Sequence, residues 1–491
     1  MLVSCVTMER DDPPTVEITL RSPITSYMVL QRGVTVPIGG MAQPGKTVVV
    51  RFAGMEKTAV ADASGSWSAA LDPMEASSEG REMTVDYAAK DSGFALTLTD
   101  VLVGEVWFCS GQSNMELGMG AMADRLNELK DGNYPRIRLF PISKSASPFP
   151  EEKVPSIWWE CSRQNLISGG WNGFSAVAFM FGRKLHKELD VPIGLIQSAY
   201  GGSPAYPWIP PEELAAEPAL RKYKSLLDSA NKNYEEQKKS DPEARHPFAD
   251  ITDYSRLRPT VLYNAMVAPI APYPIRGALW YQGESDIDKS SVYPETMRAL
   301  ISGWRRVFNA GDFPFYFVQL PPYGYGAEGL LPAMWEAQEE CLSIPNTGMV
   351  TTVDVGNPKD IHPARKREVG DRLALLALAR TYGLGGIAYS GPVYRGMTLS
   401  GDAAVIKFDH AAGGLVAKDD KPLTWFTIAG EDMKFHPARA VIDGSTVIVR
   451  SDSVKTPAAV RFAWSNLAEP NLYNAEGLPA WPFRTDGAKA P

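Results

Sequence analysis

Residues 107–118 read WFCSGQSNMELG, the pattern of an apolar run that turns directly into a helix. The apolar run ends at Gly111, and a glycine at this position permits a tight turn. The helix-like pattern begins at Ser113. A serine at such a turn is either a helix cap that accepts a backbone N–H or a nucleophile. The Gly-x-Ser-x-Gly elbow of ordinary α/β-hydrolases is not found in the chain.

Four further apolar runs follow along the chain, with helical patterns between them. Unbroken apolar runs that alternate with helices predict a parallel sheet with helices on both faces. We therefore expect an α/β fold in the middle of the chain. The five runs are GEVWFCSG (104–111), VPIGLIQSAYGG (191–202), IRGALWYQGESD (275–286), FPFYFVQL (313–320) and GMVTTVDVG (348–356).

The regions on either side of this sheet have a different residue pattern. Short β-rich runs separated by Gly, Pro and Asp are typical of β-sandwiches. A charged, helix-prone stretch inside the middle region reads as a surface insertion. The expected domains are a disordered tail or signal remnant (1–14), a β-sandwich-like domain (15–104), an α/β domain (105–385) with its insertion at about 211–257, and a β-rich C-terminal domain (386–491).

Composition narrows the class of protein. The 491 residues carry a net charge of -8, with no basic stripe, which argues against nucleic acid as a partner. No apolar run is long enough to span a membrane. The four cysteines form no disulfide framework, and no spacing indicates a metal site. Residues 2–5, LVSC, resemble the end of a bacterial lipoprotein signal, which would make the protein exported, either periplasmic or lipid-anchored; a disordered tail would leave it cytoplasmic. No feature indicates an oligomeric state.

Polar, Gly-containing turns follow four of the predicted strands. They read CSGQSN, YGGS, QGESD and VDVGNPKDIHP. Because the carboxyl ends of parallel strands meet at one edge of a sheet, these turns should lie together, at the edge where ligands bind. The sequence therefore predicts a site built from these four turns.

A nucleophilic serine needs a base, and only one histidine follows a strand of the predicted sheet. His362 lies in DIHP, where Pro363 would take the first position of a helix. The alternative role for His362 is a substitute helix cap, for which histidine is poorly suited, so a base is favoured. We expect two of the other histidines at the surface and two in the C-terminal region: His186 and His246, and His410 and His436.

The remaining parts of such a site are a carboxylate that orients the base and donors for an oxyanion. Either Asp360, two residues before His362, or Asp354 at the strand end can orient the base. Donors for an oxyanion are expected from the Ser113 N–H, from Gly201 and Gly202, and from the side-chain amide of Gln282. The supporting residues are expected to be Gly111, Asn114 and Glu284.

Several motifs resemble one family. The segments VLVGEVWFCSGQSNM, VPIGLIQSAYGG, GALWYQGESD and DIHPARKREVGDRLAL are similar to those of the bacterial sialate O-acetylesterase family, a branch of the SGNH/GDSL hydrolases. The resemblance implies a flavodoxin-like catalytic domain with flanking β-rich domains, and ester hydrolysis without a cofactor or metal. It implies Ser113 as nucleophile, His362 as base and Asp360 as orienting residue, with Ser113, Gly201 or Gly202, and Gln282 around the oxyanion.

The chain also departs from the family pattern, which leaves alternatives for the substrate. SPAYPW (203–208) replaces a segment that usually contains an acidic residue, and MWEAQ (334–338) lacks the usual arginine. The expected function is removal of acetyl groups from carbohydrate, most simply from sialic acid. The alternatives are an acetyl esterase on plant polysaccharide such as xylan and a catalytically inactive carbohydrate-binding protein. Aromatic residues expected near the edge, and able to stack on sugar rings or to lie in the core, are Trp208, Trp280, Tyr281 and Tyr323.

Overall fold

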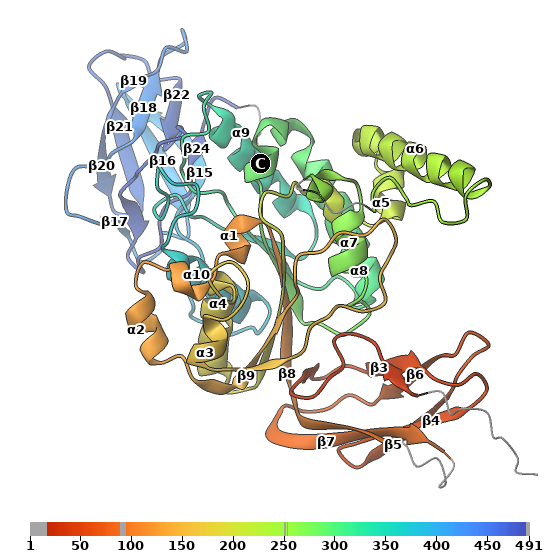
Figure 1. Ribbon diagram of the computed structural model, residues 1–491. Helices are drawn as coiled ribbons and strands as arrows, with labels where there is room; N and C mark the ends of the chain where they lie inside the picture. Colours follow the sequence, from red (N-terminus) through yellow and green to blue (C-terminus); the bar gives the residue numbers. More distant parts are fainter. Residues whose placement is uncertain (1–16, 89–94, 250–251, 253, 488–491) are drawn as a thin grey trace, which may run out of the picture.

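The computed structural model describes residues 17–88, 95–249, 252 and 254–487 (Figure 1). The segment LVSC lies outside these residues. The described part is a mixed α/β structure with β-rich regions at both ends, as the sequence predicts. None of its helices combines the length and the hydropathy needed to cross a membrane.

The middle of the chain forms a sheet in the order β10-β9-β11-β8-β12-β13-β14. All adjacent pairs are parallel except β10–β9 at one end. The five predicted strands are confirmed, whereas β9 and β10 were missed because neither is an unbroken apolar run. The bounds are β8 Ala95–Gly111, β9 Tyr134–Pro141, β10 Trp159–Cys161, β11 Ile193–Ala199, β12 Gly277–Tyr281, β13 Phe315–Val318 and β14 Thr347–Val350.

Helices cover both faces of this sheet, and neighbouring residues of β8 show why. Successive side chains of a strand point to opposite faces. The ring of Trp107 packs edge-on against Phe181 of α4, with centroids 4.9 Å apart. The ring of Phe108 packs against Trp304 of α8, at 5.2 Å, on the other face. The helices are α1 Ser113–Glu116, α2 Arg125–Lys130, α3 Arg163–Leu166, α4 Ala176–Leu189, α7 Val261–Met266, α8 Tyr293–Phe308, α9 Leu330–Glu340 and α10 Lys366–Arg380.

One long strand belongs to two sheet regions. The first part of β8 pairs with β7 and β2, and its pairing with β2 ends at Gly104. From Glu105 onward the same strand pairs with β11, and from Trp107 also with β12. The predicted division between residues 104 and 105 therefore falls inside a continuous strand, at the point where its partners change.

The flanking regions are built from short strands. Near the N-terminus, β1, β3 and β6 form a three-stranded sheet, while β2, β4, β5 and β7 extend the sheet that contains β8. Their bounds are β1 Thr19–Leu20, β2 Val29–Gln31, β3 Val36–Met41, β4 Thr47–Phe52, β5 Met55–Val60, β6 Ser66–Leu71 and β7 Ser77–Tyr87.

The C-terminal region forms three small antiparallel sheets, β15-β16-β21-β20, β17-β23 and β19-β18-β22-β24. Figure 1 shows this region and the N-terminal strands on opposite sides of the central sheet. The bounds are β15 Val393–Ser400, β16 Ala403–Asp409, β17 Leu415–Ala417, β18 Phe426–Ala429, β19 His436–Pro437, β20 Arg439–Asp443, β21 Thr446–Arg450, β22 Ala459–Phe462, β23 Leu472–Asn474 and β24 Phe483–Arg484.

The charged stretch near residues 211–257 is helical where the structure describes it. It contains α5 Pro211–Ala216 and α6 Arg221–Lys238. Figure 1 shows α6 projecting from the body of the molecule. Most of its side chains are exposed, and Leu227 and Ala230 are the buried ones. This pattern explains why a helix with so many charges is tolerated there.

Candidate active site

The turn after β8 is held tightly against β12. Gly111 has a φ of 138°, and a Cβ at this position would lie 2.2 Å from the carbonyl oxygen of Tyr281. Only glycine fits both conditions. The next residue, Gln112, donates its backbone N–H to the same Tyr281 oxygen at 3.0 Å. Ser113 is therefore presented at a fixed point of the sheet edge.

A cavity of about 560 Å³ opens at this edge, and we call it the serine cavity. The sequence predicted five of the residues that line it, which come from all four of the expected turns: Ser113, Gly201, Gly202, Glu284 and His362. Seven further lining residues were not predicted: Gln112, Glu116, Lys144, Trp171, Arg256, Ser285 and Ile361. Gly111, Asn114, Gln282 and Asp360 were predicted for the site and do not line the cavity.

Ser113 is the first residue of helix α1, and the helix cap is Gln112. The capping role considered for Ser113 is therefore not observed. Its side chain is largely buried, with 9% of the residue exposed. Among the described residues, the Ser113 hydroxyl has no hydrogen-bond partner, so it is available to a ligand in the serine cavity.

His362 lies in the loop that follows β14, and its ring faces the same cavity. Its backbone N–H donates to Oδ1 of Asp360 at 2.9 Å, while the ring Nδ1 lies 4.0 Å from that oxygen. The ring packs edge-on against Trp171, with centroids 4.8 Å apart. Burial and the charge of Lys366 hold the pKa of His362 below its ordinary value, although the charges of Asp360 and Glu116 oppose this. A neutral imidazole is the form that accepts a proton.

The predicted helix start at Pro363 is wrong, because α10 begins three residues later at Lys366. The carbonyl of Ile361 accepts a hydrogen bond from the side chain of Asn114 at 2.9 Å. This contact ties the loop that carries His362 to the helix that carries Ser113. A tertiary contact fixes the loop, in place of the hydrogen bonds of a helix. Such a contact cannot be predicted from sequence periodicity.

The two candidate carboxylates have very different surroundings. Asp354 is buried and accepts two hydrogen bonds from Arg372, at 2.7 and 2.8 Å, and one from the hydroxyl of Tyr473 at 3.0 Å. These contacts hold its pKa below the ordinary value despite the burial. Asp360 is largely exposed and lies next to His362. Of the two, Asp360 is the carboxylate beside the His362 ring, at a distance of 4.0 Å that is too long for a hydrogen bond, so the choice between them stays a prediction.

Two of the expected oxyanion donors are already engaged. The backbone N–H of Gly201 donates to Oε2 of Glu116 at 2.8 Å. The Gln282 amide donates to Oδ2 of Asp286 at 2.9 Å and to the Ser203 carbonyl at 3.3 Å, and its oxygen accepts from Tyr293. Gln282 is completely buried. The structure thus places Gln282 in the architecture of the turn, away from the serine cavity.

Two backbone donors remain beside the serine. Neither the N–H of Ser113 nor that of Gly202 has a partner in the part of the chain that the structure describes. A Cβ on Gly201 would lie 3.4 Å from Cβ of Ser113, which shows how closely the glycine turn approaches the serine. These two N–H groups are the donors that the geometry offers to an oxyanion.

We expect Gln282→Ala to lower stability more than turnover. Removing the amide leaves the Ser203 carbonyl without its donor and takes from the buried carboxylate of Asp286 one of its three donors, at a cost of about 1–3 kcal/mol. Urea unfolding and kcat of the folded fraction would be measured together. A loss of about 10²–10³ in kcat at unchanged stability would instead make Gln282 an oxyanion donor, as the sequence predicted.

A buried polar network lies beneath the cavity and was only partly predicted. The side chain of Asn114 donates to Glu284 and accepts from the ammonium group of Lys366. Burial lowers the pKa of Lys366 to about 7, against the opposing charge of Glu284. Burial also raises the pKa of Glu284. Because Asn114 follows Ser113 directly, this network fixes the helix that carries the serine.

The other histidines do not contribute to the cavity. His186 and His246 were expected at the surface, but both are buried. Nδ1 of His186 bonds to the carbonyl of Val191 at 2.8 Å, and Nε2 of His246 bonds to Asn231 at 3.0 Å. The His186 contact closes the turn after α4, whereas the His246 contact joins its loop to α6, and periodicity reveals neither contact. No group of three or more His, Cys, Asp or Glu among the described residues is arranged to hold a metal ion.

Several known proteins are similar to this chain. The family model "Carbohydrate esterase, sialic acid-specific acetylesterase" matches residues 249–379. Sialate O-acetylesterase from Rattus norvegicus is 30% identical, over 94% of this chain and 93% of its own length. The Homo sapiens enzyme is 29% identical, over 94% of this chain and 91% of its own length.

A solved structure extends the similarity to the whole fold. The crystal structure of a carbohydrate acetylesterase from Xanthomonas citri superposes with a TM-score of 0.82 and is 34% identical. The match covers 96% of this chain and 99% of the other. With the sequence relatives, this likeness shows that the chain belongs to the sialate O-acetylesterase family of carbohydrate esterases.

Proposed function

We propose that the protein is a serine esterase that removes O-acetyl groups from carbohydrate, with O-acetylated sialic acid as its substrate. The observation that carries the proposal is the meeting of Ser113 and His362 in one cavity, beside the glycine turn at 201–202. The names of the relatives support the substrate class. The proposed catalytic residues are Ser113, His362 and Asp360.

The reaction proceeds through an acetyl-enzyme. His362 removes the proton of Ser113 as Oγ attacks the acetyl carbonyl. The oxygen of the tetrahedral intermediate is stabilised by the N–H groups of Ser113 and Gly202. Collapse expels the sugar oxygen, which takes the proton from His362. Water, deprotonated by the same imidazole, then attacks the acetyl group and releases acetate and free Ser113.

The finer architecture is also part of the proposal. We assign residues 105–385 to a flavodoxin-like SGNH hydrolase domain, with the insertion near 211–257, between β-rich domains at 15–104 and 386–491. The parallel order β9-β11-β8-β12-β13-β14 and the helices on both faces support this assignment. The exported location inferred from LVSC also stays a proposal.

Acetate release from a panel of O-acetylated glycans tests the function directly. The panel contains O-acetylated sialic acid, acetylated xylan and 4-nitrophenyl acetate, each assayed with the wild-type protein and with Ser113→Ala. We expect release from the sialic acid ester by the wild-type protein alone. Release from xylan only would change the substrate, and no release from any ester would favour an inactive carbohydrate-binding protein.

The two aspartates give a further prediction. Asp354→Asn weakens a buried pair with Arg372 and should lower the free energy of unfolding by about 3 kcal/mol, with turnover retained in the folded fraction. Asp360→Asn should leave stability nearly unchanged and reduce kcat, because it acts on His362 alone. Thermal unfolding and steady-state kinetics of both variants separate the roles. If Asp354→Asn loses more turnover than Asp360→Asn at equal stability, Asp354 is the orienting residue.

A further inference from the structure

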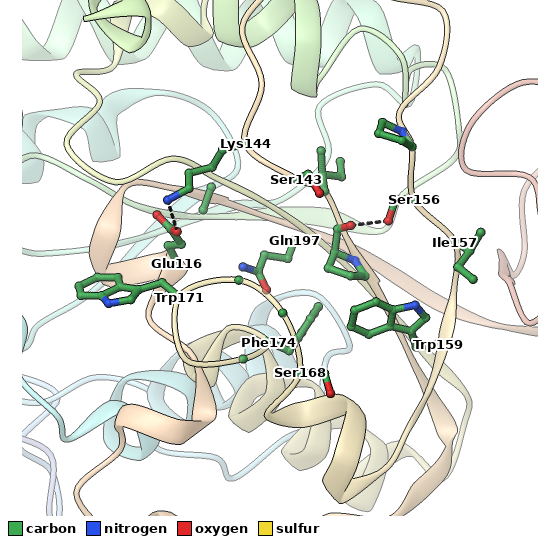
Figure 2. Close-up of a pocket in the computed structure, with 17 residues that line it drawn as sticks. Glu116, Ser143, Lys144, Ser156, Ile157, Trp159, Ser168, Trp171, Phe174 and Gln197 are labelled. Atoms are coloured by element: carbon green, nitrogen blue, oxygen red, sulfur yellow. Dashed lines mark hydrogen bonds and ion pairs between the residues drawn. The ribbon is translucent and has the colours of Figure 1, made fainter. Parts of the chain in front are cut away.

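A second cavity, of about 720 Å³, adjoins the serine cavity. The two cavities share three lining residues, Glu116, Lys144 and Trp171, so they lie on either side of the same side chains. Figure 2 shows Trp159 of β10 across this second cavity from Trp171. We call it the aromatic cavity. Its volume is within the range of about 300–1,000 Å³ that is typical of small-molecule sites.

Three of the four aromatic residues expected at the sheet edge lie elsewhere. Trp208, Trp280 and Tyr281 are completely buried in the core and cannot contact a ligand. Trp159 and Trp171 are only partly buried, and both line the aromatic cavity. Flat aromatic faces of this kind pack against the apolar faces of sugar rings. The partly exposed indoles therefore mark where a sugar would stack.

A buried amide also faces this cavity. Oε1 of Gln197 accepts the backbone N–H of Ser175 at 2.7 Å, and this contact orients the side chain. Its Nε2 has no partner among the described residues, although the residue is 94% buried, with 6% of its surface exposed. This Nε2 atom is therefore free to donate to a hydroxyl of a ligand in the aromatic cavity, which Gln197 lines.

The charge of the cavity restricts the kind of ligand. Glu116 and Lys144 are its charged lining residues within the described ranges, and they form an ion pair of 2.9 Å. Oε2 of Glu116 is also occupied by the N–H of Gly201. Since each charge is already neutralised, the aromatic cavity favours an uncharged ring over a carboxylate.

We propose that the aromatic cavity binds an uncharged sugar ring of the glycan to which the acetylated sugar is attached. The acetyl ester occupies the serine cavity, the neighbouring ring lies against Trp159, and Nε2 of Gln197 donates to one of its hydroxyls. This proposal rests on the proposed function. It makes the enzyme selective for esters on oligosaccharides over the same esters on single sugars.

The test compares one ester with and without its neutral neighbour. The substrates are O-acetylated sialic acid, free and as O-acetylated sialyllactose, and kcat/KM is measured for both. We expect Trp159→Ala to lower the ratio of sialyllactose to free sugar at least about tenfold, the size of a lost stacking contact. Trp159→Phe should retain part of the preference for sialyllactose, because a phenyl ring can still stack. Trp425→Ala, which removes a partly exposed tryptophan of the C-terminal region, is the matched control and should leave the ratio unchanged.

Binding separates this proposal from the proposed function. Ser113→Ala protein is titrated with O-acetylated sialyllactose by calorimetry, with and without Trp159→Ala. A weakening of about tenfold by Trp159→Ala supports the cavity even if the wild-type protein releases no acetate, in which case only the proposed function fails. An unchanged Kd, no binding at all, or an equal loss of kcat/KM on both substrates overturns the proposed subsite.

Discussion

Ser113→Ala is expected to reduce acetate release by about 10⁵–10⁶-fold, the loss seen when the nucleophile of a serine hydrolase is removed. The hydroxyl has no partner among the described residues and caps no helix, so its removal breaks no structural contact. The free energy of unfolding of the variant should therefore be within about 0.5 kcal/mol of the wild-type value, as for substitutions away from structural features.

The matched control for this variant is Ser110→Ala. Ser110 lies on β8, three residues before Ser113, and its buried hydroxyl also has no partner within the described residues. It should lose little activity. If Ser113→Ala keeps more than about a tenth of wild-type turnover, when a lost nucleophile costs orders of magnitude, Ser113 is not the nucleophile.

His362→Ala is expected to be nearly as inactive, because among the described residues it is the histidine that lines the serine cavity. The pH dependence of kcat/KM provides an independent measurement. Only neutral His362 can accept the serine proton, so activity falls as pH decreases through the pKa of His362. Burial holds this pKa below its ordinary value. The acid limb should therefore lie below pH 6.5, the ordinary value for histidine.

Two substitutions should move this acid limb in opposite directions. The negative charge of Asp360 raises the pKa of His362, so Asp360→Asn should shift the limb to lower pH. The positive charge of Lys366 lowers it, so Lys366→Met should shift the limb to higher pH. A profile that is flat between pH 5 and 8, or that does not respond to either change, would contradict a histidine base.

The parts of the site that were predictable are those that follow from strand order. Ser113, Gly201, Glu284 and His362 each follow a strand of the parallel sheet, and parallel strands end at one edge. Gln282 and Glu284 share one turn, and of these two only Glu284 lines the cavity. The oxyanion role predicted for Gln282 is left to the Gln282→Ala variant. A turn sequence does not specify which of its side chains points inward.

The residues that were missed come from segments without such a rule. Lys144 lies in the loop after β9 and Trp171 in the loop between α3 and α4, and neither loop follows one of the predicted strands. The strand β9, YPRIRLFP, contains two arginines, and Arg138 is buried because it pairs with Asp100 at 2.8 Å. Charged residues in a strand conceal it from a search for apolar runs. Contacts between distant segments determine these positions, and such contacts cannot be predicted from the local sequence.

Strand β8 also has a mechanical consequence. A hinge requires a few residues whose backbone can rotate freely, usually in a loop. Between Val101 and Gly111 the strand is paired on one side or both, so no such pivot exists between the N-terminal strands and Ser113. A force applied to the N-terminal sheet is therefore carried along an extended, hydrogen-bonded backbone to the turn at Gly111. We therefore expect the N-terminal strands to move together with the turn that carries Ser113, as a lever arm does, and not to swing as a tethered module.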